Sequence, residues 1–340
     1  MLPDDPSLRR RMLLTVALVV LLPFVFIYAF VAVVNGVFLP FLESLGYGPY
    51  PGRVYVEPWL AVLVVVGGLV AQARFGPGTV VGGVGARRVD ADSYPDLHES
   101  VVRLSAVADV EPPDVAVTEN EAPNAMAVRG PASTPVVVVT TGLLQRLDER
   151  EQEAVLAHEI AHVKNRDATV MTVAWLLPTA TYYVATASYY LLYGIARMFG
   201  YGGGGTSDGD GEGAAKVILV LLVAAVLTLA LSAMFWAASV LVHRLLSRYR
   251  EYAADRGAAA LTGDPAALAS ALRTMDETMP AVPDHDLREL DGGTEALYAA
   301  PLEARAFGDN DLVSTDVFPE THPPTDERIK RLREMAGELS

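Results

Sequence analysis

Long apolar segments are the feature that most constrains the fold of this chain, because a run of about 20 apolar residues can cross a lipid bilayer as a helix. Four segments approach or exceed that length, and they are residues 12–34, 59–73, 168–196 and 217–242. The chain is otherwise acidic, with a net charge of −15, and it has no basic stripe of the kind that binds nucleic acid. The sequence therefore predicts a protein with four membrane spans, embedded in the lipid bilayer, and no nucleic-acid partner.

Each apolar segment also has an alternative interpretation. Arg9, Arg10 and Arg11 precede the first segment, as basic residues do in a cleavable signal peptide, but the apolar stretch is long and no small-residue cleavage motif follows it. The second segment is the shortest and is compatible with a buried or re-entrant helix. The last two could form a hydrophobic core hairpin, although runs of this length are seldom found in cores. We therefore expect an uncleaved anchor and three further spans.

Basic residues at the ends of the segments predict the orientation, because they are enriched on the cytoplasmic side of membranes. Arginines precede the first segment and follow the second and the fourth, whereas the loop between the first two carries only Arg53. Residues 200–213, between the last two, are rich in glycine and acidic residues and are typical of a flexible external loop. We expect a multi-pass protein of the cell (plasma) membrane, with both termini and residues 74–167 in the cytoplasm.

Composition adds two expectations about the cellular context. Arginine supplies most of the positive charge, because Lys164, Lys216 and Lys330 are the only lysines. An acidic, lysine-poor surface suits a salt-adapted prokaryote, whose cytoplasm screens charge repulsion over short distances; ordinary acidic bias is the alternative. The chain has no cysteine, which excludes disulfides, thiol catalysis and cysteine-bound zinc. The sequence does not indicate an oligomeric state.

Outside the apolar segments, the patterns predict helices and a small β-sheet. Residues 93–108 have the spacing of an amphipathic helix, and residues 114–118, 124–128 and 136–141 are short β-type runs. A helix begins at Asp148, with Glu151 three residues later in a capping-box arrangement. Further helices are expected at residues 248–261, at 265–279 and after Pro324, whereas residues 280–320 are loop-rich.

The helix that begins at Asp148 carries the motif His158-Glu159-Ile160-Ala161-His162. Residues four apart share one face of a helix, so both imidazoles can bind one ion. Glu159 lies one step round the helix, which places its carboxylate beside the ion without requiring it to be a ligand. The alternative is a pair of structural histidines. We interpret the motif as a zinc site with Glu159 as the general base.

The third metal ligand comes from another part of the chain. Catalytic zinc sites usually have three protein ligands and an open position. Glu251 and Asp255 are four residues apart in a predicted helix, so one can bind the metal while the other orients a ligand imidazole. Spacing alone does not choose between them. Asp167 is another candidate for orienting a ligand. Two predicted spans separate His162 from Glu251, an even number, which brings both to the same side of the membrane.

Four separated motifs resemble the HtpX-type and Ste24-type membrane metallopeptidases. They are HEIAHVKNRD, SRYREYAADRGAA, PNAMA at residues 123–127 and THPPTDERIKRL at residues 321–332, and the resemblance covers residues 55 to 335 approximately. Ste24-type enzymes have more spans, so the four predicted here favour the HtpX-like branch, which degrades misfolded or damaged membrane proteins.

The resemblance implies roles for several residues. It implies Glu251 as the third zinc ligand, with Asp255 behind a ligand histidine. It also implies that His322 helps to stabilise the transition state, where the alternative is a turn histidine. An edge strand would pair with the substrate through Asn124, Ala125, Met126 and Ala127, where the alternative is an ordinary edge strand. Met126 stands where an aromatic residue is usual, which bears on side-chain preference. Arg328 is expected to anchor the terminal helix.

The predicted fold is mainly α with a small β-sheet: a four-span membrane helical protein with a gluzincin-like zinc peptidase domain on the cytoplasmic side. The expected division is an N-terminal membrane hairpin at 1–75, a first peptidase part at 76–167, a second membrane hairpin at 168–243 and a second peptidase part at 244–340. The expected activity is zinc-dependent endopeptidase cleavage of unfolded or membrane proteins, with one Zn²⁺ per chain.

Three other functions are less well supported by the sequence. A zinc-binding scaffold that had lost catalysis would lack Glu159, which is present. A transporter would need ionisable residues in the middle of its spans, and the four segments have none there. Cleavage of prenylated C-terminal peptides, as in the Ste24 branch, is an alternative within the same enzyme class.

Overall fold

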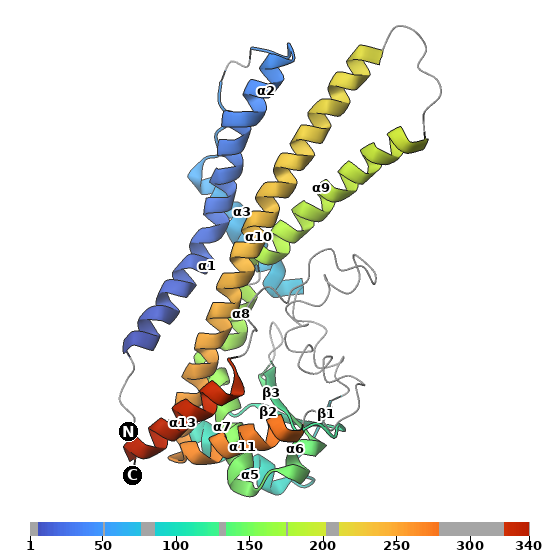
Figure 1. Cartoon of the computed structure of the whole chain (residues 1–340). Coiled ribbons are helices and arrows are strands. Elements are labelled where there is room, and N and C mark those ends of the chain that lie inside the picture. Colours follow the sequence, from blue (N-terminus) through green and yellow to red (C-terminus); the bar gives the residue numbers. More distant parts are fainter. Residues whose placement is uncertain are drawn as a thin grey trace. The chain divides into compact units, whose positions relative to one another are not determined.

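The computed structural model of the chain describes residues 6–49, 52–75, 86–128, 134–174, 176–201, 211–278 and 323–339. These residues form helices and one small sheet, as the sequence predicts (Figure 1). The chain divides into two compact units. The first comprises Met1–Val16, Ala71–Val173 and His243–Ser340, and the second comprises Ala17–Val70 and Ala174–Val242.

The first unit contains a four-stranded mixed sheet. Its strands are β1 (Arg87–Arg88), β2 (Asp114–Thr118), β3 (Ala125–Val128) and β4 (Val136–Thr140), in the order β1-β2-β4-β3. The central strands β2 and β4 are parallel and almost entirely buried, which explains their continuous apolar runs. β3 pairs with β4 in antiparallel fashion and is an edge strand. The sheet confirms the three predicted β-type runs to within a residue.

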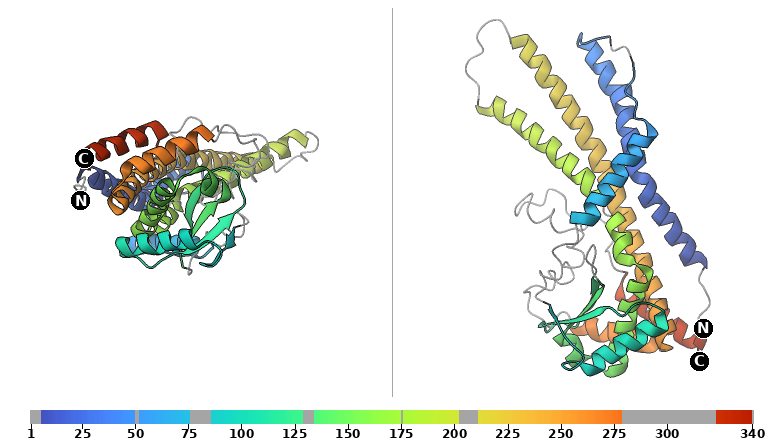
Figure 2. Two further views of the ribbon diagram at one scale, coloured as in Figure 1. Left: turned by 90° about the horizontal axis from the view of Figure 1, so that it is seen from below. Right: turned by 180° about the vertical axis from the view of Figure 1, so that it is seen from behind.

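Helices pack beside this sheet around one hydrophobic core. They are α5 (Pro95–Ala108), α6 (Thr141–Arg146), α7 (Glu149–Asn165), α11 (Pro265–Thr278), α13 (Thr325–Leu339) and the C-terminal part of α10 (Gly211–Thr262), and α8 (Asp167–Ala174) follows α7 in the chain. The core includes Leu104 of α5, Val137 of β4, Ile160 of α7, Leu268 of α11 and Leu332 of α13. Figures 1 and 2 show α11 and α13 lying side by side, with α7 next to the sheet.

Helix α7 begins where the sequence predicts. The Asp148 side chain accepts from the backbone N–H of Glu151 at 2.8 Å, and the backbone N–H of Asp148 donates to the Glu151 side chain at 3.1 Å. This reciprocal capping box satisfies two amides that the helix itself leaves unpaired. Residues 154–161 of α7 are all buried, so the histidine motif lies inside the unit and not on its surface.

A glycine allows α10 to approach α7 closely. A β-carbon on Gly257 would lie 2.7 Å from the Cβ of Ala161, which is closer than two carbon atoms pack. Only glycine fits at this crossing, because it has no side chain. The close approach brings the segment of α10 that carries Glu251 and Asp255 against the helix that carries the two histidines.

Two helices in the described part of the chain are long and apolar enough to cross a bilayer. One is Pro6–Ser44, formed by α1 (Pro6–Val33), a π-helical turn (Val34–Phe38) and α2 (Leu39–Ser44), and the other is Ala215–Thr262 within α10. Only 6% and 17% of their most apolar stretches are buried, whereas the core helix of a soluble protein would be mostly buried. Their exposed apolar side chains suit contact with lipid.

The prediction of four spans is therefore corrected to two for the described residues. Helix α3 (Pro58–Phe75) covers the second predicted span, but its apolar part, Pro58–Ala71, is short for a crossing. The third predicted span, residues 168–196, falls on α8 and on α9 (Leu176–Tyr201), and neither helix, as described, is both long and apolar enough to cross a bilayer. In α9, tyrosines and threonines alternate with the apolar residues, and their hydroxyl groups lower its mean hydropathy.

The first helix packs within the second unit. The ring of Phe26 in α1 meets the ring of Phe235 in α10 edge-on, with 5.2 Å between centroids. Leu22 and Phe26 join Leu177, Leu231 and Phe235 in one apolar cluster. The choice between an uncleaved anchor and a signal peptide stays a prediction.

Candidate metal centre

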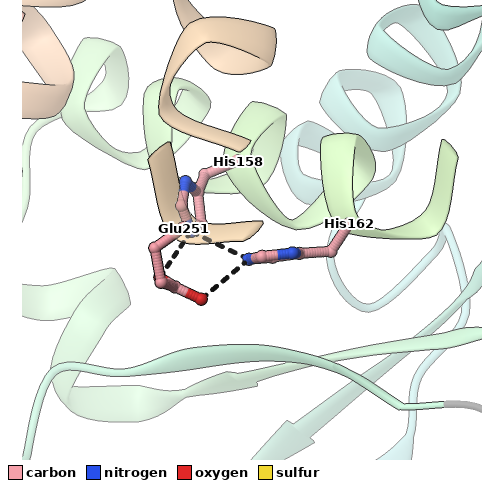
Figure 3. Close-up of side chains that lie close together, drawn as sticks. All are labelled: His158, His162 and Glu251. Carbon is pink, nitrogen blue, oxygen red and sulfur yellow. Dashed lines mark hydrogen bonds and ion pairs between the residues drawn. The ribbon is translucent and has the colours of Figure 1, made fainter. Parts of the chain in front are cut away.

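Three side chains from two helices converge in the first unit (Figure 3). Helix α7 contributes His158 and His162, and α10 contributes Glu251. The Nε2 atoms of the two histidines are 3.1 Å apart, and each lies 3.5 Å from an oxygen of the Glu251 carboxylate. The three groups offer ligand atoms that all lie within 4.8 Å of one another, so they could hold one metal ion.

The other ring nitrogen of each histidine faces an aspartate. Nδ1 of His162 lies 2.5 Å from Asp167 Oδ2, and Nδ1 of His158 lies 3.1 Å from Asp255 Oδ1. Such carboxylates hold the Nδ1 proton and leave the Nε2 lone pair available for a metal. The two Nε2 atoms are 3.1 Å apart, a separation that either a shared proton or a bound cation stabilises. With the Glu251 carboxylate facing both of them, the donor set fits a metal ion, and two imidazoles with one carboxylate suit Zn²⁺.

The geometry distinguishes the two acidic residues that the spacing left open. Glu251 faces the Nε2 atoms of both histidines, whereas Asp255 faces the opposite nitrogen of His158. Glu251 is thus placed to bind a metal, and Asp255 is placed to orient His158. Asp167 is placed in the same way behind His162. These positions agree with the predicted roles, and metal binding itself stays a prediction.

Glu159 is buried next to His158 on α7, and it is not one of the three converging ligand groups. Burial raises the pKa of Glu159, and the nearby His162 and His158 partly offset this rise. The backbone N–H of Ala127, in edge strand β3, donates a hydrogen bond to the Glu159 carboxylate. A carboxylate with a raised pKa accepts a proton more readily than an exposed one, which suits a general base.

The pKa of His158 reflects its two carboxylate neighbours. Burial disfavours the charged imidazolium, but Asp255 and Glu251 outweigh this effect and raise the pKa of His158 to about 9 in the protein alone. A metal that binds at Nε2 therefore displaces a proton from this histidine at neutral pH, as is usual for histidine ligands.

The sequence analysis did not place two arginines at this site. Arg328 of α13 donates to Asp255 through Nε at 3.0 Å and Nη2 at 2.7 Å. Arg250 of α10 lies with its Nε 3.2 Å from Asp167 Oδ2. Arg328 belongs to the fourth motif and falls on the apolar face of an amphipathic helix, which is a detectable sign of a buried, paired arginine.

The predicted substrate strand borders the site. Ala125, Met126 and Ala127 belong to β3, and Asn124 directly precedes it, with its backbone N–H and C=O both bonded to Thr140. Met126 is buried. His322 lies outside the described residues, so its role stays a prediction.

Comparisons with known proteins decide the family. Residues 92–336 match the model of peptidase family M48. A protein named Protease HtpX homolog 2, from Methanosarcina acetivorans, is 35% identical over 89% of this chain and 92% of its own length. The chain belongs to peptidase family M48.

Other relatives of this M48 peptidase cover nearly the whole chain. Protease HtpX homolog from Moorella thermoacetica is 36% identical over 99% of this chain and 97% of its own length. The crystal structure of S. mikatae Ste24p is a more distant match, with a TM-score of 0.46 at 16% identity over 92% of this chain and 65% of that one. The protein is accordingly a hydrolase of the metalloprotease type with membrane helices, and its family implies a metal cofactor.

Proposed function

We propose that this M48 peptidase is a zinc-dependent endopeptidase that cleaves misfolded or damaged membrane proteins. The observation that supports it best is the convergence of two imidazole Nε2 atoms and the Glu251 carboxylate, with Glu159 buried beside them on the same helix as the histidines. A structural pair of histidines would need neither a carboxylate facing both Nε2 atoms nor an aspartate behind each ring.

The residues have separate tasks in this mechanism. His158, His162 and Glu251 would hold one Zn²⁺, which supplies a Lewis acid that polarises the scissile carbonyl and acidifies water. Glu159 takes the proton of the attacking water at its carboxylate and then gives that proton to the departing amine nitrogen. Strand β3 packs against α7, and the Ala127 backbone favours the charged form of Glu159.

Edge strand β3 is the proposed substrate-binding element. An extended peptide can add to an edge strand through backbone hydrogen bonds, which give affinity without requiring a particular sequence. Because β3 contacts the Glu159 carboxylate through Ala127, a peptide on this edge would lie close to the general base. Sequence-independent binding fits unfolded substrates. By family resemblance, His322 is proposed to donate to the transition state.

We propose that the first unit, which carries the candidate metal centre and is called the peptidase unit below, faces the cytoplasm. Each candidate span has one end in the first unit, and arginines lie at that end. They are Arg9, Arg10, Arg11, Arg244, Arg248 and Arg250. Clusters of this kind remain on the cytoplasmic side of a membrane. Asp and Glu contribute little to this preference, so the acidic composition does not oppose the assignment.

Cysteine labelling would test the orientation directly, because the natural chain has no cysteine. Val102, in α5, is 53% exposed, and Tyr55, between α2 and α3, is 67% exposed. In intact cells, a membrane-impermeant maleimide is expected to label Tyr55→Cys but not Val102→Cys, and both after permeabilisation. Labelling of Val102→Cys in intact cells would place the peptidase unit outside.

Metal removal tests the proposed chemistry. The detergent-solubilised protein is expected to cleave an unfolded membrane protein, to lose that activity after treatment with a zinc chelator and to recover it when Zn²⁺ is added back. Fragment formation on gels and the metal content before and after treatment are the measurements. The proposal fails if activity survives when the protein holds no transition metal.

A further inference from the structure

Arg328 lies on the last helix of the chain, yet it contacts the candidate metal centre. Besides its two hydrogen bonds to Asp255, its Nη1 lies 3.4 Å from Glu251 Oε2 and its Nη2 lies 3.5 Å from His158 Nε2. The residue is buried, with 9% of its surface exposed. One guanidinium thus reaches two of the three candidate ligands and the aspartate that faces one of them.

Anchoring the helix does not by itself explain a buried arginine at this position. Ile329, Leu332 and Met335 already bury the apolar face of α13 in the core. Arg331 adds a polar anchor, because its guanidinium lies 3.8 Å from the centre of the Tyr252 ring in α10. Burying a charged group is costly unless it is paired, so the position of Arg328 is best explained by the groups it contacts.

The charge of the site also calls for a cation. Four carboxylates are buried in and around the cluster, and they belong to Glu159, Asp167, Glu251 and Asp255. A guanidinium stays charged at any physiological pH, so Arg328 balances part of this negative charge whether or not a metal is bound.

The planar fork of Arg328 matches the Asp255 carboxylate. Two parallel N–H groups donate to its two oxygens, an arrangement that fixes the plane of the carboxylate as well as its distance. Asp255 Oδ1 in turn lies 3.1 Å from Nδ1 of His158. On the other side of the site, Arg250 approaches Asp167 with a single 3.2 Å contact, and Asp167 faces His162.

We propose that Arg328 is a positioning residue of the metal centre, which orients His158 through Asp255 and steadies the Glu251 carboxylate. This inference rests on the proposed zinc-dependent function. It makes α13 part of the metal centre, so the site is complete only when the C-terminal helix is docked on α11.

The test measures zinc affinity, and not only activity, in the detergent-solubilised full-length protein. Competition with a chromophoric chelator gives the affinity, and the visible spectrum of the Co²⁺-substituted protein reports the ligand geometry. Arg328→Gln is expected to weaken zinc binding by about 10- to 100-fold, the range typical of residues that orient metal ligands. Arg328→Lys should recover part of this loss, because lysine restores the charge but not the two-pronged contact.

Two further variants separate positioning from anchoring. Arg331→Gln removes the neighbouring arginine that holds α13 on Tyr252, so it is expected to lower the melting temperature while leaving zinc affinity unchanged. Asp255→Asn removes the residue through which Arg328 acts. In that background, Arg328→Gln is expected to cost clearly less affinity than it does in the natural protein, because contacting residues are energetically coupled.

The possible results distinguish the inference from the proposed function. If the natural protein binds no zinc, the proposed function fails and this inference fails with it. If the natural protein binds zinc but Arg328→Gln keeps both its affinity and the cobalt spectrum, only the inference is overturned. An equal loss in Arg331→Gln would also overturn it, because anchoring would then suffice. Should Arg328→Gln not fold, unchanged affinity in Arg328→Lys would be the overturning result.

Discussion

Replacing Glu159 by glutamine is expected to stop proteolysis while the protein keeps its zinc. Glutamine has nearly the same shape as glutamate, but it cannot take a proton from water at neutral pH. Glu159 is not among the three converging ligand groups, so the metal should remain bound. Loss of a general base typically costs about 10²- to 10⁴-fold in rate. Initial rates on an unfolded membrane substrate, together with zinc content, would measure both effects.

Glu153→Gln is the matched control for this variant. Glu153 lies on the same helix, but its carboxylate pairs with Arg103 at 2.5 Å on the surface of the unit. The same chemical change there is expected to leave activity and zinc content as in the natural protein. Full activity in Glu159→Gln would exclude Glu159 as the base, and loss of zinc in that variant would mean that Glu159 also helps to hold the metal.

The zinc-binding helix was predictable because its signals are local. The Asp148–Glu151 capping box identifies the first turn, and a spacing of four residues puts His158 and His162 on one face. The structure keeps both features. Strands β2 and β4 were predictable for a similar reason, since short valine-rich runs between turns are typical of buried strands.

The arrangement around the two histidines depends on contacts between segments that lie far apart in the sequence. Nothing in the spacing of the chain shows that Gly257 lets α10 approach Ala161, or that Arg328 reaches Asp255 from the last helix. A pair of acidic residues four apart also offers two equivalent candidates on one helical face. Only the tertiary structure shows which of them faces the Nε2 atoms.

In the described part of the chain, fewer helices suit a crossing than predicted, because a prediction from length and apolar content ignores the kind of residue. Tyr183, Tyr190 and Tyr193 of α9 are all at least 49% exposed, and their hydroxyl groups are poorly suited to the hydrocarbon centre of a bilayer. In α3, the apolar stretch Pro58–Ala71 is shorter than a typical crossing. The sequence therefore indicated the membrane class correctly but not the number of helices suited to crossing.

Glu251→Ala is expected to abolish stable zinc binding, and with it proteolysis. Among the described residues, the substitution leaves two imidazoles as the converging donors, whereas catalytic zinc sites usually have three protein ligands. Asp255→Asn is the matched comparison, because it changes the other buried carboxylate of the same helical segment without changing its size. That variant should keep the metal with an affinity reduced by about 10- to 100-fold, as expected for a residue that orients a ligand. Metal analysis and chelator competition on the purified proteins would separate the two effects.

The opposite result would assign the third ligand to Asp255. In that case Glu251→Ala would keep a zinc content near that of the natural protein, and Asp255→Asn would lose its zinc completely. The two side chains would then have to exchange the roles that their distances to His158 and His162 indicate.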